Sequence, residues 1–247
     1  MEQTTRKFGL TANQLRLFAL LFMLLDHMWA TVISGNLWMT CVGRLAFPIF
    51  AFQISEGFVH TSNVKRYAKR LLLFALIAEI PFNLMLSASW IYPFHQNVLF
   101  TLLLGLGAVY ALDRARRQGG TKAAAKGIGL ALLCVLGGAV TFVDYGAMGV
   151  ATVILFYLCR GFRGAKLCQL IGLVFINCYM ISGMDLPFTL LGHEFFFPMQ
   201  SIAVGSLVFI WLYNGRKGHS SKAMQYAAYA FYPVHALVLY LIALATR

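Results

Sequence analysis

Most of the chain is divided into apolar runs of about 20 residues, and short polar stretches separate these runs. A helix of that length crosses a hydrocarbon core of about 30 Å. The pattern predicts nine membrane-spanning helices, and a count of eight or ten also fits it. We therefore expect an all-α, polytopic bundle in which residues 1–247 form one integral-membrane domain. The predicted spans are residues 14–34, 37–58, 67–87, 97–113, 127–142, 145–160, 166–183, 197–213 and 226–245.

Composition supports this class and argues against others. The chain is 60% hydrophobic and only 11% charged, whereas soluble domains are about half apolar and about a quarter charged. Its net charge of +12 does not indicate nucleic-acid binding, because a basic face for phosphates needs folded, solvated surface and this chain has only short loops. The five cysteines have no paired short spacing, so we expect small buried side chains with no disulfide and no metal site.

The positions of Lys and Arg predict the orientation of the chain. Cytoplasmic loops of membrane proteins are enriched in these residues. With a cytoplasmic N-terminus, 18 of the 20 Lys and Arg residues fall on the cytoplasmic side, and the exceptions are Arg44 and Arg247. The first apolar run is too long for a signal-peptide core and is interrupted by Asp26 and His27. We expect a multi-pass protein of a bacterial inner membrane with its C-terminus outside.

Ionisable residues within the first span are the main functional signal. Arg16 and His27 are eleven positions apart, which places them on one face of a helix, about 16 Å apart along its axis. Asp26 precedes His27 and points about 100° away from it. Charged groups are costly inside a bilayer, and those that occur there usually face a polar interior and mark a functional site.

Further polar residues are predicted to lie at membrane depth in other spans. A buried Arg44 needs an acid, and Asp26 and Glu79 are the available ones; we expect Asp26 to pair with Arg44, which leaves His27 to titrate. Glu79 and Asn83 are one helical turn apart, and Tyr232 and His235 also share a face. A purely structural role is the competing interpretation, and it is stronger for His235 than for His27.

A basic cluster opens the third predicted span. It consists of Lys65, Arg66, Lys69 and Arg70. Such a cluster is typical of an anchor for lipid headgroups, and a role in binding substrate phosphates is the alternative.

Several local motifs resemble one known family. They are Met23-Leu24-Leu25-Asp26-His27, Gly43-Arg44-Leu45-Ala46-Phe47-Pro48, Glu56-Gly57-Phe58-Val59-His60, Ile80-Pro81-Phe82-Asn83 and Phe231-Tyr232-Pro233-Val234-His235. Together they resemble the TraX family over essentially the whole chain. That family is named for acetylation of a conjugative pilin at its N-terminus. It groups with the membrane acyltransferases that include the acyltransferase-3 and heparan-alpha-glucosaminide N-acetyltransferase families. Arg16 and His27 also resemble the Arg, ten residues, His pattern of the acyltransferase-3 proteins.

The resemblance implies an acyltransferase that uses acetyl-CoA or another acyl-CoA as co-substrate. The expected catalytic residues are His27, Asp26, Arg44, Glu79 and Asn83. The residues expected to bind the donor are Arg16, Lys65, Arg66, Lys69, Arg70, Tyr232 and His235. His27 acts as general base on a hydroxyl or amine acceptor, or as a covalent acyl carrier. Arg44 or Asn83 stabilises the oxyanion.

The partners and the competing functions remain open at this stage. The acceptor is a peptide N-terminus, a glycan or a lipid head, and membrane lipid and a homo-oligomer are further possible partners. A proton-coupled secondary transporter also places ionisable residues within the membrane, but the sequence contains no matching halves with interrupted helices. A non-catalytic scaffold for envelope assembly does not need the buried charges.

Overall fold

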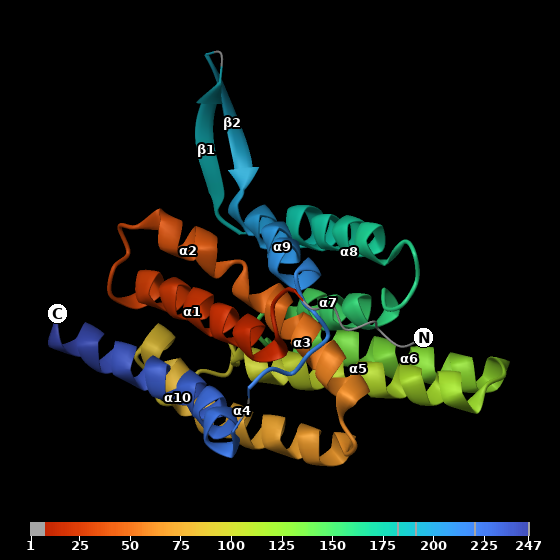
Figure 1. Ribbon diagram of the computed structural model, residues 1–247. Coiled ribbons are helices and arrows are strands. Elements are labelled where there is room, and N and C mark those ends of the chain that lie inside the picture. The colour runs from red at the N-terminus through yellow and green to blue at the C-terminus, as the bar shows by residue number, and fades with distance from the viewer. Residues whose placement is uncertain (1–7, 182, 191, 220, 247) are drawn as a thin grey trace. The chain divides into compact units, whose positions relative to one another are not determined.

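The structure, a computed structural model, describes residues 8–181, 183–190, 192–219 and 221–246 (Figure 1). It is mostly helical, as the apolar runs predict. The described residues form two compact units. Unit 1 comprises the residues up to Ile49 and Cys159–His219, and unit 2 comprises Phe50–Leu158 and the residues from 221 onward. Each unit is described by itself.

Unit 1 is built around helix α1. Its elements are α1 (Ala12–Thr31), α2 (Leu37–Gly43), the start of α3 (Ala46–His60), α8 (Ala165–Val174), the π-helix η1 (Phe175–Met180), β1 (Asp185–Leu190), β2 (His193–Pro198), the 3₁₀-helix η2 (Met199–Gly205) and α9 (Ser206–Trp211). The side chain of Thr11 caps the first turn of α1 in a reciprocal pair with Gln14. Helix α1 packs against α2, and η2 packs against α2, α8, η1 and α9.

Unit 2 is a set of longer helices. It contains the rest of α3, α4 (Val64–Ser87), α5 (Val98–Gln118), α6 (Thr121–Val140), α7 (Gly146–Leu158) and α10 (Lys222–Ala245). Helix α4 packs against α5 and α10, while α5, α6 and α7 pack against one another. Gly105 lies against Val153 and Gly127 against Ala115, with no room for a larger side chain at either glycine. Small residues let helices approach closely, as is typical of membrane proteins.

Five helices are long and apolar enough to cross a membrane. They are Leu37–His60 (α2 and α3 together), Val64–Ser87, Val98–Gln118, Thr121–Val140 and Ala223–Ala245. The other predicted spans also contain helix, namely the 20-residue α1 and the shorter apolar helices Gly146–Leu158, Ala165–Met180 and Met199–Trp211. Together they describe a membrane protein, while nine crossings and a cytoplasmic N-terminus stay predictions.

The all-α expectation is wrong for one segment of unit 1, where β1 and β2 form an antiparallel hairpin that extends away from the unit's helices (Figure 1). The register pairs Leu190 with His193 across a two-residue connection, and Gly192 there has a φ of +79°. Glycine adopts this conformation readily. Phe195 to Phe197 favour a strand, and the prolines at 187 and 198 disfavour a helix.

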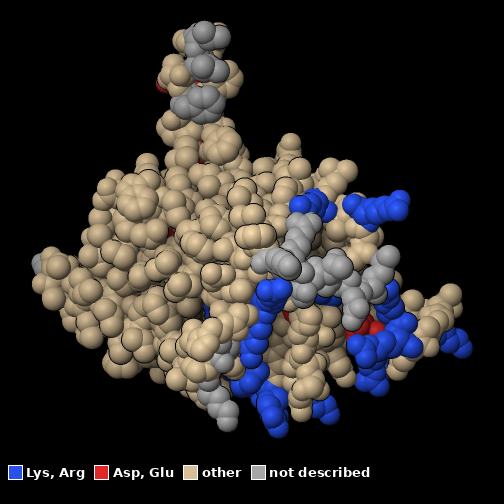
Figure 2. All heavy atoms as spheres, viewed as in Figure 1, with Lys and Arg blue, Asp and Glu red and all other residues tan. Residues whose placement is uncertain are grey.

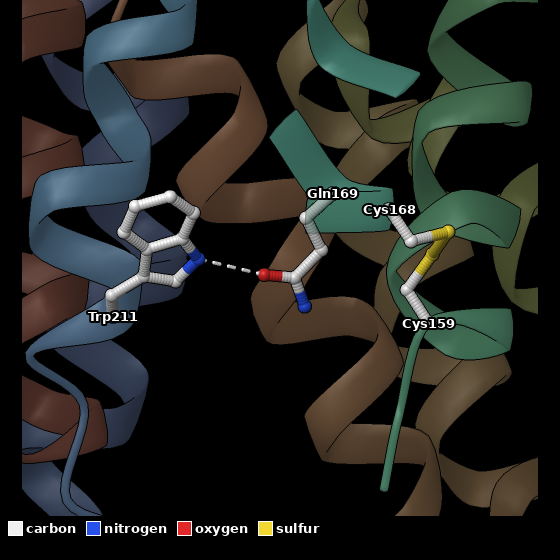
Figure 3. The surroundings of a disulfide bond; sticks show 4 residues. All are labelled: Cys159, Cys168, Gln169 and Trp211. Atoms are coloured by element: carbon white, nitrogen blue, oxygen red, sulfur yellow. Dashed lines mark hydrogen bonds between the residues drawn. A yellow bond between two sulfur atoms is a disulfide. The ribbon is translucent and has the colours of Figure 1, made fainter. Parts of the chain in front are cut away.

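The expectation of no disulfide is wrong for one pair of cysteines. Cys159 and Cys168 are joined by a disulfide, with their Cα atoms 6.2 Å apart (Figure 3). The turn between α7 and α8 brings the two residues together, which their spacing of nine did not indicate. Beside the bridge, Trp211 Nε1 donates a hydrogen bond of 2.9 Å to Gln169 Oε1, which links α9 to α8 (Figure 3).

Candidate functional site

Unit 1 contains a polar network, here called the Asp26 cluster, in which the charged pair is partly buried and the uncharged members are buried. Its members are Asp26, Thr40, Arg44, Asn177 and Gln200. Arg44 follows the last residue of α2, at the break before α3. Its Nη2 donates to both carboxylate oxygens of Asp26 at 2.5 Å, and Thr40 Oγ1 donates to Asp26 Oδ1 at 2.6 Å. The predicted pairing of Asp26 with Arg44 is therefore confirmed.

The cluster continues into two irregular helices. Arg44 Nη1 lies 3.4 Å from Gln200 Oε1 in η2, and Gln200 Nε2 donates to Asn177 Oδ1 in η1 at 2.9 Å. Asn177 Nδ2 in turn donates to the Leu173 carbonyl at 3.0 Å. Asn177 and Gln200 are 2% and 5% exposed, so an unbonded amide at either position would be costly. The network therefore connects α1 and α2 to η1 and η2.

A glycine makes this arrangement possible. A Cβ atom at Gly43 would overlap the Asp26 Cβ atom and lie 2.7 Å from Asp26 Oδ1. Atoms cannot approach so closely without a shift of the backbone or of Asp26. Gly43 thus lets α2 lie close enough to α1 for the Arg44 guanidinium to reach the carboxylate.

Arg16 and His27 lie on the same continuous helix as the cluster. Both belong to α1 and both are partly buried. The His27 carbonyl accepts a hydrogen bond from Thr31 Oγ1 at 2.6 Å. Because α1 is unbroken from Ala12 to Thr31, the spacing of eleven residues keeps the two side chains on one helix face, as predicted.

Unit 2 contains a second set of polar residues, here called the Glu79 cluster. Its members are Glu79, Asn83, His95, Asn97 and Asp144. Glu79 Oε2 accepts hydrogen bonds from Asn97 Nδ2 at 2.6 Å and from the Asn97 backbone at 3.2 Å. Asn97 Nδ2 also donates to the Ala75 carbonyl at 2.9 Å. Glu79 therefore neutralises the amino end of α5, where unpaired N–H groups favour an anion.

The loop between α4 and α5 returns along α4 to make these contacts. Helix α4 ends at Ser87, yet Asn97 bonds to residues two to three turns earlier, about 12 Å back along the helix axis at Glu79. The chain after Gln96 is held there by the segment that precedes α7, because the Gln96 amide donates to the Phe142 carbonyl and the Asp144 amide to the Gln96 carbonyl.

This second segment brings an ion pair to the same cluster. His95 Nε2 lies 3.6 Å from Asp144 Oδ1, and the Thr101 hydroxyl on α5 donates to the Asp144 carbonyl. The hydrogen bond to Asp144 raises the pKa of His95 above its usual value of 6.5, although burial acts in the opposite direction. The Phe82 ring of α4 packs edge-on against the His95 imidazole, with ring centroids 5.2 Å apart.

Tyr232 and His235 of α10 are both buried in unit 2, at 5% and 6% exposure. Tyr232 interacts with the Val98 backbone and lies within electrostatic range of Glu79 and Asp144. His235 Nδ1 is 2.8 Å from the Phe231 carbonyl, and its ring contacts both Phe231 and Tyr232. Tyr232 therefore borders the Glu79 cluster, and His235 packs behind it.

The predicted basic cluster lies at the opposite end of α4 from the Glu79 cluster. Lys65, Arg66, Lys69 and Arg70 occupy the first two turns of α4 and all are exposed. Because α4 and α5 run antiparallel, this end of unit 2 also carries Arg116 and Arg117 from the last turn of α5. Exposed Lys and Arg side chains are blue in Figure 2. Arg247 lies outside the described residues.

Sequence reasoning assigned Asp26 and Arg44 correctly as partners but missed residues that complete each cluster. In unit 1 these are Thr40, Asn177 and Gln200; in unit 2 they are His95, Asn97 and Asp144. Asn177 and Gln200 are single uncharged amides within apolar runs, which is only a weak sign of a functional site. Their position in irregular helices, which often occur at functional sites, is visible only in the structure. Glu79, considered as an acid for Arg44, binds Asn97 instead.

These features define a helical membrane protein with ionisable networks inside its helix bundle. Comparisons with known proteins agree: the sequence model described as TraX protein matches residues 11–243. The chain belongs to the TraX family. It is also 30% identical to the probable fimbrial assembly protein FimC, serogroup H1, of Dichelobacter nodosus, over 95% of this chain and 96% of that protein. No solved structure matches it.

Proposed function

We propose that this protein is a membrane-embedded acyltransferase that moves an acyl group, most simply acetyl, from cytosolic acyl-CoA to an amine or hydroxyl acceptor. The N-terminus is cytoplasmic in this proposal, and the protein resides in the bacterial inner membrane. The observation that carries the proposal is the arrangement of α1, which holds Arg16 and His27 on one face beside an anchored Asp26.

His27 acts as the general base. It takes the proton from the acceptor N–H or O–H while the acceptor attacks the thioester carbonyl, and the departing CoA thiolate then recovers that proton. An imidazole suits both steps because its ordinary pKa lies near neutral pH. A covalent acyl-imidazole at His27 is the alternative route.

Arg44 serves the site as a positioning residue. Its guanidinium is bound to Asp26 and directed toward Gln200, which leaves little of it for a developing oxyanion. By tying α1 to α2 and η2, it fixes the rotation of α1 and hence the direction of the neighbouring His27 side chain. Rigid support of a reacting group is a large part of enzymatic rate enhancement.

Cationic side chains support binding of the donor. CoA is anionic at its nucleotide end, and Arg16 at the start of α1 supplies a charge for its phosphates. Lys65, Arg66, Lys69 and Arg70 supply further exposed charges. Tyr232 and His235 remain proposed contacts for the buried part of the donor.

The relative suggests the biological setting. FimC of Dichelobacter nodosus is named as a probable fimbrial assembly protein. We extend that role to this chain and propose that the acceptor is a component of a surface fibre or of its assembly machinery.

The test is transfer of label from acetyl-CoA by the purified full-length protein to acceptors in a membrane extract. We expect His27→Ala to lower transfer by about 10² to 10⁴, the usual contribution of a general base. His193→Ala, at an exposed histidine of β2, is the matched control and should retain activity. Thermal unfolding in detergent verifies that both variants are folded.

Two results would contradict the proposal. One is full transfer by a folded His27→Ala protein. The other is substrate flux across the membrane of liposomes that contain the wild-type protein, in the absence of acyl-CoA and without formation of labelled product. That result would indicate a transporter. Mass analysis of the quenched protein separates the two chemical routes, because only the covalent route leaves an acyl group on the α1 peptide.

A further inference from the structure

Two oxygen atoms in the Glu79 cluster have no hydrogen-bond donor among the described residues. The two hydrogen bonds that reach Glu79 both end on Oε2, so Oε1 receives none. Asn83 Oδ1 is also without a donor, although Asn83 is only 3% exposed. Glu79 is only partly buried, so its free oxygen remains open to a ligand. A buried acceptor without a donor, such as Asn83 Oδ1, is uncommon in folded proteins and calls for a ligand or a water molecule.

The two oxygens belong to the same face of α4. Asn83 follows Glu79 by four residues, so their Cβ atoms are about 6 Å apart. Phe82, three residues after Glu79, lies on that face as well and contacts the His95 ring. The Asn83 side chain is therefore directed toward the same side of α4 as Glu79 and His95, where the returning loop and the amino end of α5 also lie.

The charges of the cluster select the kind of ligand. Glu79 and Asp144 are acidic, and the one basic partner, His95, is already paired with Asp144. The positive end of α5 is occupied by Glu79 Oε2. A phosphate or a carboxylate would be repelled here. A primary ammonium group instead brings three N–H donors and a positive charge, which match two unoccupied acceptors and a nearby acid.

The returning loop adds an apolar border. Trp90, Tyr92 and Phe94 are 69%, 40% and 63% exposed on the same loop as His95. Aromatic faces attract cations and also accommodate the apolar part of an amphipathic amine. The site thus combines acceptors for an ammonium head with a surface for a hydrophobic group attached to it.

We propose that the Glu79 cluster binds a primary ammonium group through Glu79 Oε1 and Asn83 Oδ1. This inference rests on the proposed acyltransferase function and deepens it, because it gives the protonated head of an amine acceptor a binding site at this cluster. The basic cluster at the other end of α4 is about 20 Å away along the helix, so donor phosphates and acceptor ammonium are attracted to opposite ends of unit 2.

The test is a binding measurement without acyl-CoA. The full-length protein in a non-ionic detergent is titrated with 2-phenylethylamine, and 2-phenylethanol serves as a neutral probe of nearly the same shape. Binding is followed by isothermal calorimetry and by thermal unfolding at constant ionic strength. We expect the amine to bind and stabilise the protein, and the alcohol to do so at least about tenfold more weakly.

Variants identify the site. Asn83→Leu is the clean substitution, because the Asn83 side chain makes no hydrogen bond within the described chain, and Glu79→Gln removes the charge. Each should weaken amine binding by about tenfold or more. Glu194→Gln, at an exposed acid in β2, is the matched control and should bind like wild type. If Glu79→Gln unfolds because it disturbs the start of α5, Asn83→Leu still decides the outcome.

Equal binding of amine and alcohol, unchanged amine binding in Asn83→Leu, or equal protection by sodium or magnesium chloride would overturn the inference. These outcomes are separate from those for acyl transfer. An acetyltransferase that labels only hydroxyl acceptors and does not bind the amine retains its proposed function and loses this site. Amine binding that persists in a His27→Ala protein without transfer activity leaves both proposals intact.

Discussion

The two polar clusters differ in how completely their hydrogen bonds are satisfied. In the Asp26 cluster a charge pair is followed by an unbroken series of amide contacts from Arg44 through Gln200 to Asn177. In the Glu79 cluster one carboxylate oxygen and one buried amide oxygen have no donor in the described chain. The unsatisfied amide oxygen of Asn83 costs free energy that a ligand can recover. The first cluster therefore suits support of structure, and the second suits the recognition proposed for it.

The two clusters also differ in the backbone elements that supply their polar groups. The Asp26 cluster uses the irregular helices η1 and η2, whose altered hydrogen-bonding pattern directs amides inward. The Glu79 cluster uses helix ends, where N–H groups without a helical partner meet a carboxylate. Both are ways to satisfy polar groups in an apolar bundle, where backbone and side-chain groups have little access to water.

The largest expected effect comes from Arg44→Ala. It leaves the Asp26 carboxylate without its cation, and loss of one partner from such a pair costs about 3 kcal/mol or more. We expect a corresponding fall in the free energy of unfolding, measured by thermal or chemical unfolding in detergent, and a loss of acyl transfer. Arg163→Ala, at an exposed arginine of unit 1, is the control.

A double variant sharpens this result. Asp26→Leu combined with Arg44→Leu removes both charges and should recover much of the lost stability, because neither partner is left unpaired. If Arg44→Ala is as stable as wild type, the Asp26 cluster does not have the structural role assigned to it.

Gly43→Ala should have the next largest effect on stability. The added methyl group meets the Asp26 side chain, and we expect a loss of about 2 kcal/mol, as for other overpacked interiors. Gly129→Ala in α6 is the matched helical control, because a Cβ atom there meets nothing within 4 Å. Unfolding curves of the two variants measured side by side check the difference, and equal stability would show that α2 can move away from α1 without cost.

Asn97→Ala should have a smaller effect. It removes the side chain that starts α5 and the hydrogen bond to Glu79, and loss of a helix cap costs about 1 to 2 kcal/mol. Asn63→Ala removes the exposed cap of α4 without a link to a carboxylate, so it should cost less. Hydrogen exchange of the first α5 amides is the most direct measurement. Identical losses in the two variants would mean that Glu79 does not depend on Asn97.

The smallest predicted effect depends on pH. Since the pKa of folded His95 is raised, its pairing with Asp144 contributes fully below pH 6.5 and is lost as the pH rises above 6.5 through the folded value. Wild-type stability should therefore decline more over this range than that of His95→Gln. Thermal unfolding from pH 5 to pH 9 checks it, with His193→Gln as the exposed control. Parallel pH curves for wild type and His95→Gln would contradict the pairing.

Much of the fold follows from local patterns. All nine predicted apolar segments contain helix, because a helix satisfies its own backbone hydrogen bonds where apolar surroundings offer no other partners. The hairpin at residues 185–198 and the disulfide between Cys159 and Cys168 were not predicted. Strand pairing and the approach of two cysteines depend on the path of the chain through a turn. The periodicity of apolar residues does not describe that path.

For the candidate site, the sequence determined which charges lie within apolar runs and that Arg16 and His27 share a helix face. It also indicated that Arg44 pairs with Asp26, because few acids are available to a buried guanidinium. Only the tertiary structure decided that Gln200 and Asn177 complete this network and that Asn97 returns to Glu79. Helix periodicity acts over a few turns of one segment, whereas the partners of a buried amide are set by how separate segments pack.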